Sequence, residues 1–252
     1  MEVIWHGTAS IELRAQSGKI LFDPFIPLKG SPVTVKIEEF DGFEDIFITH
    51  GHFDHVASLP EIYGRNPEVK IYCTQTPYRT LLKKGISREN LVLLNFGDEV
   101  CVQGFKIRLL HGKHSKLPKL TPKRVCGYLT SSARGNIPYL IRENRACREN
   151  GETAFYDIEA EGKSISILGS LNLRKDEQYP TERDLAIMAY NGWKDNLPPA
   201  VAIIERLNPK KVFLDHYDDT FPPLTGEIDL APVLEKYADR VRALERNKVE
   251  VI

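Results

Sequence analysis

Cysteines and long apolar runs are scarce in this 252-residue sequence. Its four cysteines are widely spaced and form no C-x-x-C pair, which argues against a disulfide framework or a cysteine-rich zinc site. No apolar run approaches the roughly 20 residues of a membrane-spanning helix. The opening MEVIWHGTAS also lacks the basic and apolar regions of a signal peptide. We therefore expect a cytoplasmic protein without a membrane span.

An excess of charge of either sign is also missing. Lys and Arg number 34 and Asp and Glu 35, for a net charge of −1, so the overall balance does not indicate nucleic acid or an anionic membrane as partner. The 42% hydrophobic and 27% charged residues are ordinary for globular proteins and exclude a disordered chain or a coiled coil. We expect one domain over residues 1–252; a homo-oligomer is compatible with this composition.

Short β-rich segments dominate the first half, and helices are more frequent in the second. Strands are predicted at 2–5, 10–14, 19–22, 45–49, 69–73, 91–94, 100–102, 105–110, 125–130, 153–158, 164–168 and 211–215. Helices are predicted from 76 to near 85 and at 181–190, 199–207 and 230–245. This order predicts two sheets with helices outside. The polar segment 133–150 interrupts the pattern and is predicted to be an inserted loop or lid.

The strongest local signal is the peptide THGHFDH at 49–55, which directly follows an apolar strand. It places His50, His52, His55 and Asp54 within six residues, in a chain with seven histidines. Neutral imidazole nitrogen is a good ligand for zinc and similar divalent ions. The alternative is a solvated polar turn, and the density of histidine makes that the weaker interpretation.

This H-x-H-x-D-H motif resembles the signature of the metallo-β-lactamase fold superfamily. The closest subgroup contains L-ascorbate-6-phosphate lactonase and N-acyl-phosphatidylethanolamine-hydrolysing phospholipase D, whose first strand and turn are similar to Ile4–Ser10 here. Asp23, His114 and His216 follow in the family's order. The resemblance implies an α+β fold, a four-layer αβ/βα sandwich of two mixed β-sheets with helices outside.

The resemblance also implies a metal site. His50, His52 and His114 would form one metal position, and Asp54, His55 and His216 a second. Asp23 would orient a metal-binding histidine. Asp54 would act as ligand, base or proton shuttle. The expected cofactor is one or two divalent ions, zinc first and manganese as the alternative.

One departure from the family pattern concerns the aspartate that bridges two metals. The matching place reads Leu168-Gly169-Ser170-Leu171-Asn172, with Ser170 where the aspartate is expected. A hydroxyl is a poorer ligand than a carboxylate, so we expect either one tightly held ion or two of unequal affinity. Asp215 and Asp218 are candidates to compensate.

Two further histidines remain candidates beside the site. His111 is three residues from His114, and composition does not separate the two, although the family order favours His114. His6 follows a short strand and is expected either to line the pocket or to be a polar turn residue.

A basic stretch follows the predicted strand at 105–110. It comprises Lys113, Lys116, Lys119, Lys123, Arg124, Arg134, Arg142, Arg145 and Arg148. These cations predict an anionic small-molecule substrate, and the alternative is a solvated charged loop. The few aromatic residues nearby make nucleic acid a weaker candidate.

The predicted function is a metal-dependent hydrolase acting with metal-activated water on an ester, lactone or phosphodiester. A degenerate member that binds metal or ligand without turnover, and a nuclease, are the alternatives.

Overall fold

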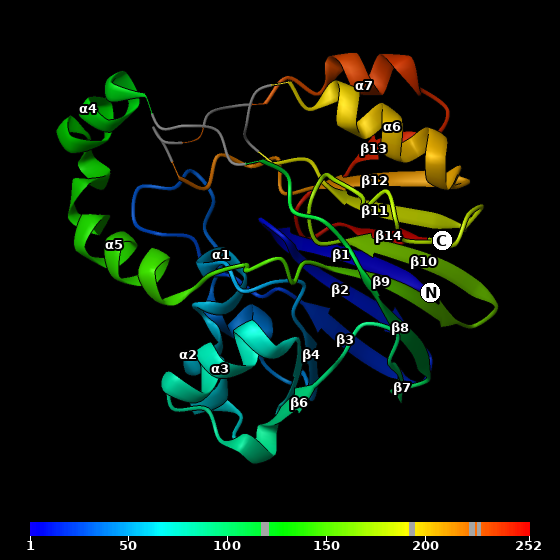
Figure 1. Cartoon of the computed structure of the whole chain (residues 1–252), viewed down its shortest axis with the longest axis horizontal. Helices are drawn as coiled ribbons and strands as arrows, with labels where there is room; N and C mark the ends of the chain where they lie inside the picture. The colour runs from blue at the N-terminus through cyan, green and yellow to red at the C-terminus, as the bar shows by residue number, and fades with distance from the viewer. Residues whose placement is uncertain (117–120, 192–194, 222–224, 226–227) are drawn as a thin grey trace.

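The computed structural model describes the chain except for residues 117–120, 192–194, 222–224 and 226–227, and except for the side chains of Arg124 and Ser132. Within this described part, two seven-stranded sheets face each other (Figure 1). The first has the order β14 (Val249–Val251), β1 (Glu2–Gly7), β2 (Ser10–Ala15), β3 (Gly18–Phe22), β4 (Asp45–Phe47), β5 (Lys70–Cys73) and β6 (Leu91–Leu93). The second has the order β13 (Val241–Ala243), β12 (Lys211–Asp215), β11 (Leu185–Ala189), β10 (Lys163–Leu168), β9 (Ala154–Ala160), β8 (Phe105–His111) and β7 (Glu99–Val102).

Each sheet is mixed in the same way. Three antiparallel pairings join β14 to β3 in the first sheet and β7 to β10 in the second. Three parallel pairings then continue each sheet to β6 and to β13. The two halves of the chain therefore repeat one arrangement, and the expected α+β sandwich of two mixed sheets is confirmed.

Helices cover the outer faces of both sheets. The first sheet is covered by η1 (Ile37–Phe40), α1 (Phe53–Val56), α2 (Leu59–Arg65), α3 (Gln75–Lys83) and η2 (Arg88–Asn90). The second is covered by α6 (Leu197–Leu207) and α7 (Ala231–Lys236). None of the described helices is long and apolar enough to cross a membrane.

The strands are apolar on both sides because each sheet is buried between two layers. On β11, Leu185 and Ile187 face the other sheet, whereas Ala186 and Met188 face α6. This alternation produces the continuous apolar run that is typical of a strand buried on both faces.

An aromatic cluster joins the sheets directly beneath the histidine motif. Phe47 stacks on Tyr72 at a centroid distance of 4.4 Å and meets Tyr156 edge-on at 5.7 Å. The hydroxyl of Tyr156, on β9, donates a hydrogen bond of 2.7 Å to the carbonyl of Ile48. The chain entering the motif is thus tied to the opposite sheet.

Four segments differ from the sequence-based expectation. Residues 125–130 were expected to form a strand and belong to α4 (Pro122–Thr130). Pro122 occupies the first helical position, where its missing N–H costs nothing. Val125, Tyr128 and Leu129 lie at the i, i+3, i+4 spacing of a helical face. The β-branched and aromatic residues favoured a strand and concealed that period.

The expected helix at 181–190 is wrong, because this region contains β11. Ala, Leu and Met are good helix formers, but burial between β10 and β12 overrides their propensity. The expected helix at 230–245 ends early, since α7 stops at Lys236 and β13 then pairs with β12.

Segment 133–150, expected to be a loop or lid, is largely helical. It contains η3 (Ser132–Asn136) and α5 (Ile137–Ala146), with Pro138 in the first turn of α5. Together with α4 these helices stand beside the sandwich rather than over either sheet (Figure 1).

The tie between the sheets yields a first prediction. Tyr156→Phe removes the hydrogen bond to buried Ile48 and is expected to lower the free energy of unfolding by about 1–2 kcal/mol. Urea unfolding measures this as a lower midpoint. Tyr63→Phe is the control, because the Tyr63 hydroxyl makes no hydrogen bond within the described residues, and its midpoint should stay unchanged. Equal midpoints for both variants would contradict the structural role given to Tyr156.

Candidate metal centre

The histidine motif is held by the buried carboxylate of Asp23 at the end of β3. Asp23 accepts hydrogen bonds from the Thr49 backbone N–H at 2.8 Å and from the Thr49 hydroxyl at 2.5 Å. The same carboxylate lies 2.8 Å from Nδ1 of His55. Asp23 therefore fixes both the start of the motif and the orientation of the His55 ring, the position that the resemblance implies for it.

Gly51, between His50 and His52, lets the backbone of the helical insert approach the motif closely. A Cβ atom at this position would lie 2.2 Å from the carbonyl oxygen of Arg148, at the end of the helical insert. Any side chain there would push the insert away. The metal-binding motif and the insert are therefore in direct backbone contact.

The first group of candidate ligands consists of His50, His52 and His114. Their ligand atoms all lie within 4.8 Å of one another. Nε2 of His50 is 3.0 Å from Nδ1 of His52, and the His114 ring centroid lies 4.6 Å from that of His52. His114 follows β8, so two separate parts of the chain supply this group.

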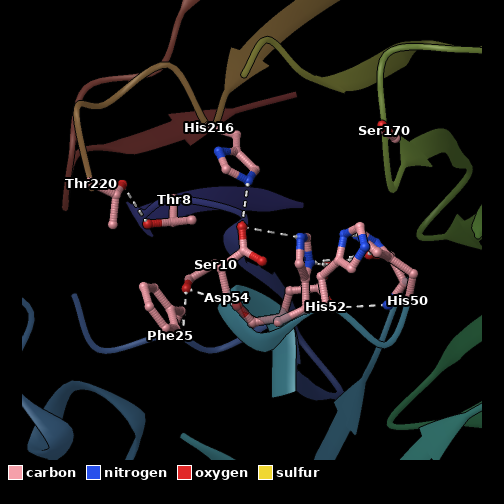
Figure 2. Close-up of polar contacts among 12 residues, drawn as sticks. Thr8, Ser10, Phe25, His50, His52, Asp54, Ser170, His216 and Thr220 are labelled. Atoms are coloured by element: carbon pink, nitrogen blue, oxygen red, sulfur yellow. Dashed lines mark hydrogen bonds and ion pairs between the residues drawn. The ribbon is translucent and has the colours of Figure 1, made fainter. Parts of the chain in front are cut away.

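The second group consists of Asp54, His55 and His216, whose ligand atoms also lie within 4.8 Å of one another. Oδ2 of Asp54 is 3.4 Å from Nε2 of His216 and 3.8 Å from Nε2 of His55. Figure 2 shows Asp54 between His216 and the histidine motif. His216 follows β12 in the second sheet, so this group spans the two sheets.

The two groups differ in charge. Burial lowers the pKa of His50 well below its usual value and that of His52 to about 4, with neighbouring histidines adding to the shift. Burial also lowers the pKa of His114. The first group is therefore neutral, as ligation requires.

In the second group, opposite charges outweigh burial. Burial alone would lower the pKa of His216, but its hydrogen bond to Asp54 and the charge of Asp54 raise it to about 9. Burial would raise the pKa of Asp54, but His55 and His216 lower it. Burial would also lower the pKa of His55, and Asp23 and Asp54 raise it. In the second group these shifts favour a protonated His216 beside an ionised Asp54.

Ser170 holds the loop that carries His114. Its hydroxyl accepts a hydrogen bond from the Ser115 backbone N–H at 3.0 Å and donates to the Ser115 hydroxyl at 3.1 Å. Its side chain is thereby engaged next to His114. Within the described residues, Asp54 is the only carboxylate in either ligand group.

His111 and His6 do not join the ligand groups or line the cavity described below. His111 stacks on Phe96 at 3.9 Å and bonds the carbonyl of Gly151 at 2.8 Å. His6 lies 2.9 Å from Glu12 on the neighbouring strand. Both histidines have partners elsewhere.

Some residues around the site were not recognised from the sequence. Thr8 accepts a hydrogen bond from the His216 backbone N–H at 2.8 Å and donates its own N–H to Asp218 at 2.8 Å. Ser10 donates to the carbonyl of Asp23 at 2.9 Å. A cluster of histidines in the sequence indicates candidate ligands. The contacts of Thr8 and Ser10 join distant parts of the chain, so no local sequence pattern indicates them.

Three of the ten non-glycine residues with a positive φ angle in the described part of the chain lie at this site. Thr8, Asp23 and His216 have positive φ angles of 49°, 45° and 57°. For a β-branched residue such as Thr8 this conformation is rare. Such strain persists only where surrounding contacts enforce it, and it concentrates at functional sites.

Of the two acidic residues expected to compensate for Ser170, Asp218 lies nearer the reaction space. It lines the same cavity as the ligand groups, whereas Asp215 is buried on β12 and burial raises its pKa to about 7.

Both ligand groups lie in a cavity of about 630 Å³. Its walls are mainly apolar, and include Phe53, Val125, Leu129, Leu140, Ile141 and Phe221. Among the described lining residues there is no lysine or arginine. Lys119 and the side chain of Arg124 lie outside the described part of the chain.

The donor set suits a divalent cation. It offers five imidazoles and one carboxylate, the mixed nitrogen and oxygen donors that zinc prefers. Nitrogen atoms of five rings converge here from distant segments, and Asp23 supports the His55 ring from behind, as is usual for metal-binding histidines.

Comparisons with known proteins find relatives that match most of this chain. Two relatives are called UPF0173 metal-dependent hydrolase. The one from Solibacter usitatus is 28% identical over 255 residues, covering 97% of this chain and 94% of its own. The one from Ligilactobacillus salivarius is 26% identical over 236 residues, covering 91% and 90%.

Solved structures show the same fold. Igni18, described as a novel metallo hydrolase from Ignicoccus hospitalis, aligns with a TM-score of 0.68 at 19% identity, over 99% of this chain and 97% of its own. An isothiocyanate hydrolase from Delia radicum gut bacteria aligns with a TM-score of 0.66 at 13% identity, over 100% and 99%.

A family model described as "Beta-lactamase superfamily domain" matches residues 18–217. The match includes Asp23, the histidine motif, His114 and His216. The superfamily resemblance is confirmed, and the chain belongs to the beta-lactamase superfamily.

Proposed function

We propose that this chain is a metal-dependent hydrolase in which His50, His52 and His114 hold one divalent ion. Asp54, His55 and His216 hold a second ion with lower affinity. The observation that carries the proposal is the convergence of six ligand atoms in two adjacent groups on one cavity. The name metal-dependent hydrolase, carried by relatives that match nearly the whole chain, supports the same class.

Zinc is the proposed metal, with manganese as the alternative. The first group is made of imidazole alone, which favours zinc over harder cations. The second group contains a carboxylate, which manganese also accepts. Ser170 contributes no charge, so the two positions are expected to differ in affinity.

The cavity residues have separate tasks in hydrolysis. A bound divalent ion would lower the pKa of a water molecule and polarise the scissile group. Asp54 lies beside His216 and is ionised. Its carboxylate is therefore suited to bind the ion and to accept a hydrogen bond that the water molecule donates. Once a substrate covers them, the apolar walls would exclude bulk water and strengthen each electrostatic contact.

The substrate proposed here is a small molecule with a lactone, ester or phosphodiester bond. An anionic substrate was expected from the basic stretch, but the described cavity lining contains no lysine or arginine. We therefore favour an uncharged ester or lactone. The same absence of lysine and arginine from the described lining makes a nuclease the weaker alternative.

Ser170 favours one further candidate, a member of the family that binds a metal without turnover. Loss of the bridging carboxylate would leave the first ion in place and weaken the second. Metal content and activity must therefore be measured together.

Removal of one ligand tests the proposal. His52→Ala is expected to lose the first ion and to reduce hydrolysis of generic lactones and esters by more than about 100-fold, because it removes a metal ligand. Elemental analysis of the purified protein and initial rates measure the two effects, and circular dichroism checks the fold.

His111→Ala is the matched control, since His111 lies outside both ligand groups. It should keep its metal and its activity. If wild type binds metal but hydrolyses none of the substrates, the non-catalytic candidate gains; if His52→Ala retains both metal and activity, the proposed site is wrong.

The charge difference between the groups predicts a pH-dependent stoichiometry. His52, with a pKa of about 4, is already neutral at about pH 6, so the first group has no proton to lose on binding. His216, with a pKa of about 9, must release a proton, so affinity at the second group should rise about tenfold per pH unit up to about pH 9.

Isothermal titration with zinc is thus expected to show one ion near pH 6 and to approach two near pH 9. His216→Ala should bind one ion under both conditions. Two ions of equal affinity near pH 6 would refute the assignment of unequal positions.

A further inference from the structure

Helix α4 and the helical insert at 133–150 together present apolar side chains to the cavity that remain open to solvent. Val125 is 39% exposed, Leu129 51% and Ile141 50%. All three line the cavity, and they are half of the large apolar side chains that are exposed in the described part of the chain. Exposed apolar side chains gathered at one place indicate a binding surface.

This apolar wall, formed by Val125, Leu129 and Ile141, continues into the candidate metal centre. Phe53 lies between His52 and Asp54 in the motif and packs against the cluster of Tyr128, Ala133 and Leu140 in the insert. The same cavity contains the ligand groups and the wall. A molecule whose reacting group reached the metals would therefore extend along the wall.

The insert is anchored, so the wall has a defined position. Glu143 on α5 is buried and lies 2.5 Å from Nζ of Lys84, which follows α3. At the other end of α5, the Asn136 side-chain amide donates a hydrogen bond of 2.8 Å to the carbonyl of Lys29. Gly51 adds the close contact with Arg148 described above. These contacts lie away from the apolar side chains.

The charge of the cavity narrows the chemistry of its occupant. Its described lining carries the carboxylates of Asp54 and Asp218 and no lysine or arginine. The wall residues themselves are uncharged, so an anionic chain would lose its hydration there without a counter-charge, whereas an uncharged alkyl or aryl chain would gain from burial. A cavity of about 630 Å³ suits a ligand of drug-like size.

We propose that the wall of α4 and α5 binds the uncharged alkyl or aryl chain of the substrate, with the scissile ester or lactone at the metal centre. This inference rests on the proposed function and adds the substrate class to it. Selectivity comes from the insert, and the strand ends supply the chemistry.

The experiment uses the metal-loaded full chain and a series of p-nitrophenyl esters from acetate to octanoate. Each methylene buried on the wall should raise kcat/KM by about two- to fourfold. Leu129→Ser and Ile141→Ser should each lower the ratio of kcat/KM for octanoate over acetate by about tenfold.

Leu93→Ser is the matched control. Leu93 is 39% exposed, lies on edge strand β6 and does not line the cavity, so its ratio should equal that of wild type. A ratio that does not depend on chain length, or that falls equally in the control, would overturn the proposal.

A binding measurement separates this inference from the proposed function. The uncharged fluorophore N-phenyl-1-naphthylamine should bind wild type, be displaced by octanol, and bind about tenfold more weakly to Leu129→Ser and Ile141→Ser. If the fluorophore binds as expected but no ester is hydrolysed, the hydrolase proposal fails and the binding role of the wall stands. If esters are hydrolysed without chain selectivity and the fluorophore does not bind, the proposed role of the wall is wrong and the hydrolase proposal stands.

The same variants test two other possible occupants of the wall, a second copy of the chain and a lipid surface. Sedimentation velocity shows whether the wall joins two copies of the chain, and flotation with phosphatidylcholine vesicles shows whether it meets a lipid surface. Self-association or vesicle binding that is lost in Leu129→Ser, together with absent fluorophore binding, would overturn the proposal.

Discussion

The carboxylate of Asp23 is the contact on which the rest of the site depends. It binds the backbone and hydroxyl of Thr49 and lies against His55, all within a buried region. An unpaired carboxylate there would be costly, so the three contacts are needed together. They link the end of β3 to the end of β4. This explains why a residue at φ 45° is retained at this position.

The opposite pKa shifts of the two ligand groups have one structural origin. In the first group burial outweighs the nearby carboxylates, so the pKa values of the rings are lowered and the rings stay neutral. In the second group the carboxylates outweigh burial: Asp23 and Asp54 raise the pKa of His55, and Asp54 raises that of His216. A family carboxylate at the place of Ser170 would add a second negative charge. Its replacement makes Asp54 the only anion in the two ligand groups, and the asymmetry between them follows.

How far the sequence predicts this protein depends on whether the signal is local. The motif at 49–55 is local, and the ordered matches at Asp23, His114 and His216 predicted which residues converge. The strands leading into them were also predictable, because each has a clear apolar run. By contrast, β11 consists of residues that favour helices, and only its neighbours β10 and β12 make it a strand. Val125 and Tyr128 favoured a strand, whereas their contact with the insert and the cavity makes a helix.

The candidate ligands and the apolar wall lie on different parts of the fold. The ends of the strands hold the ligands, and these positions follow from the two sheets. The insert, in contrast, joins β8 to β9 and touches the motif through Arg148 and Gly51. Its helices can change without disturbing the sheets, so they provide the part of the cavity on which selectivity can vary. Because the backbone of the insert lies directly against Gly51, a change in its position would also shift the candidate ligands His50 and His52. The apolar wall and the two ligand groups are therefore coupled through Gly51 and through Phe53, which packs on the insert.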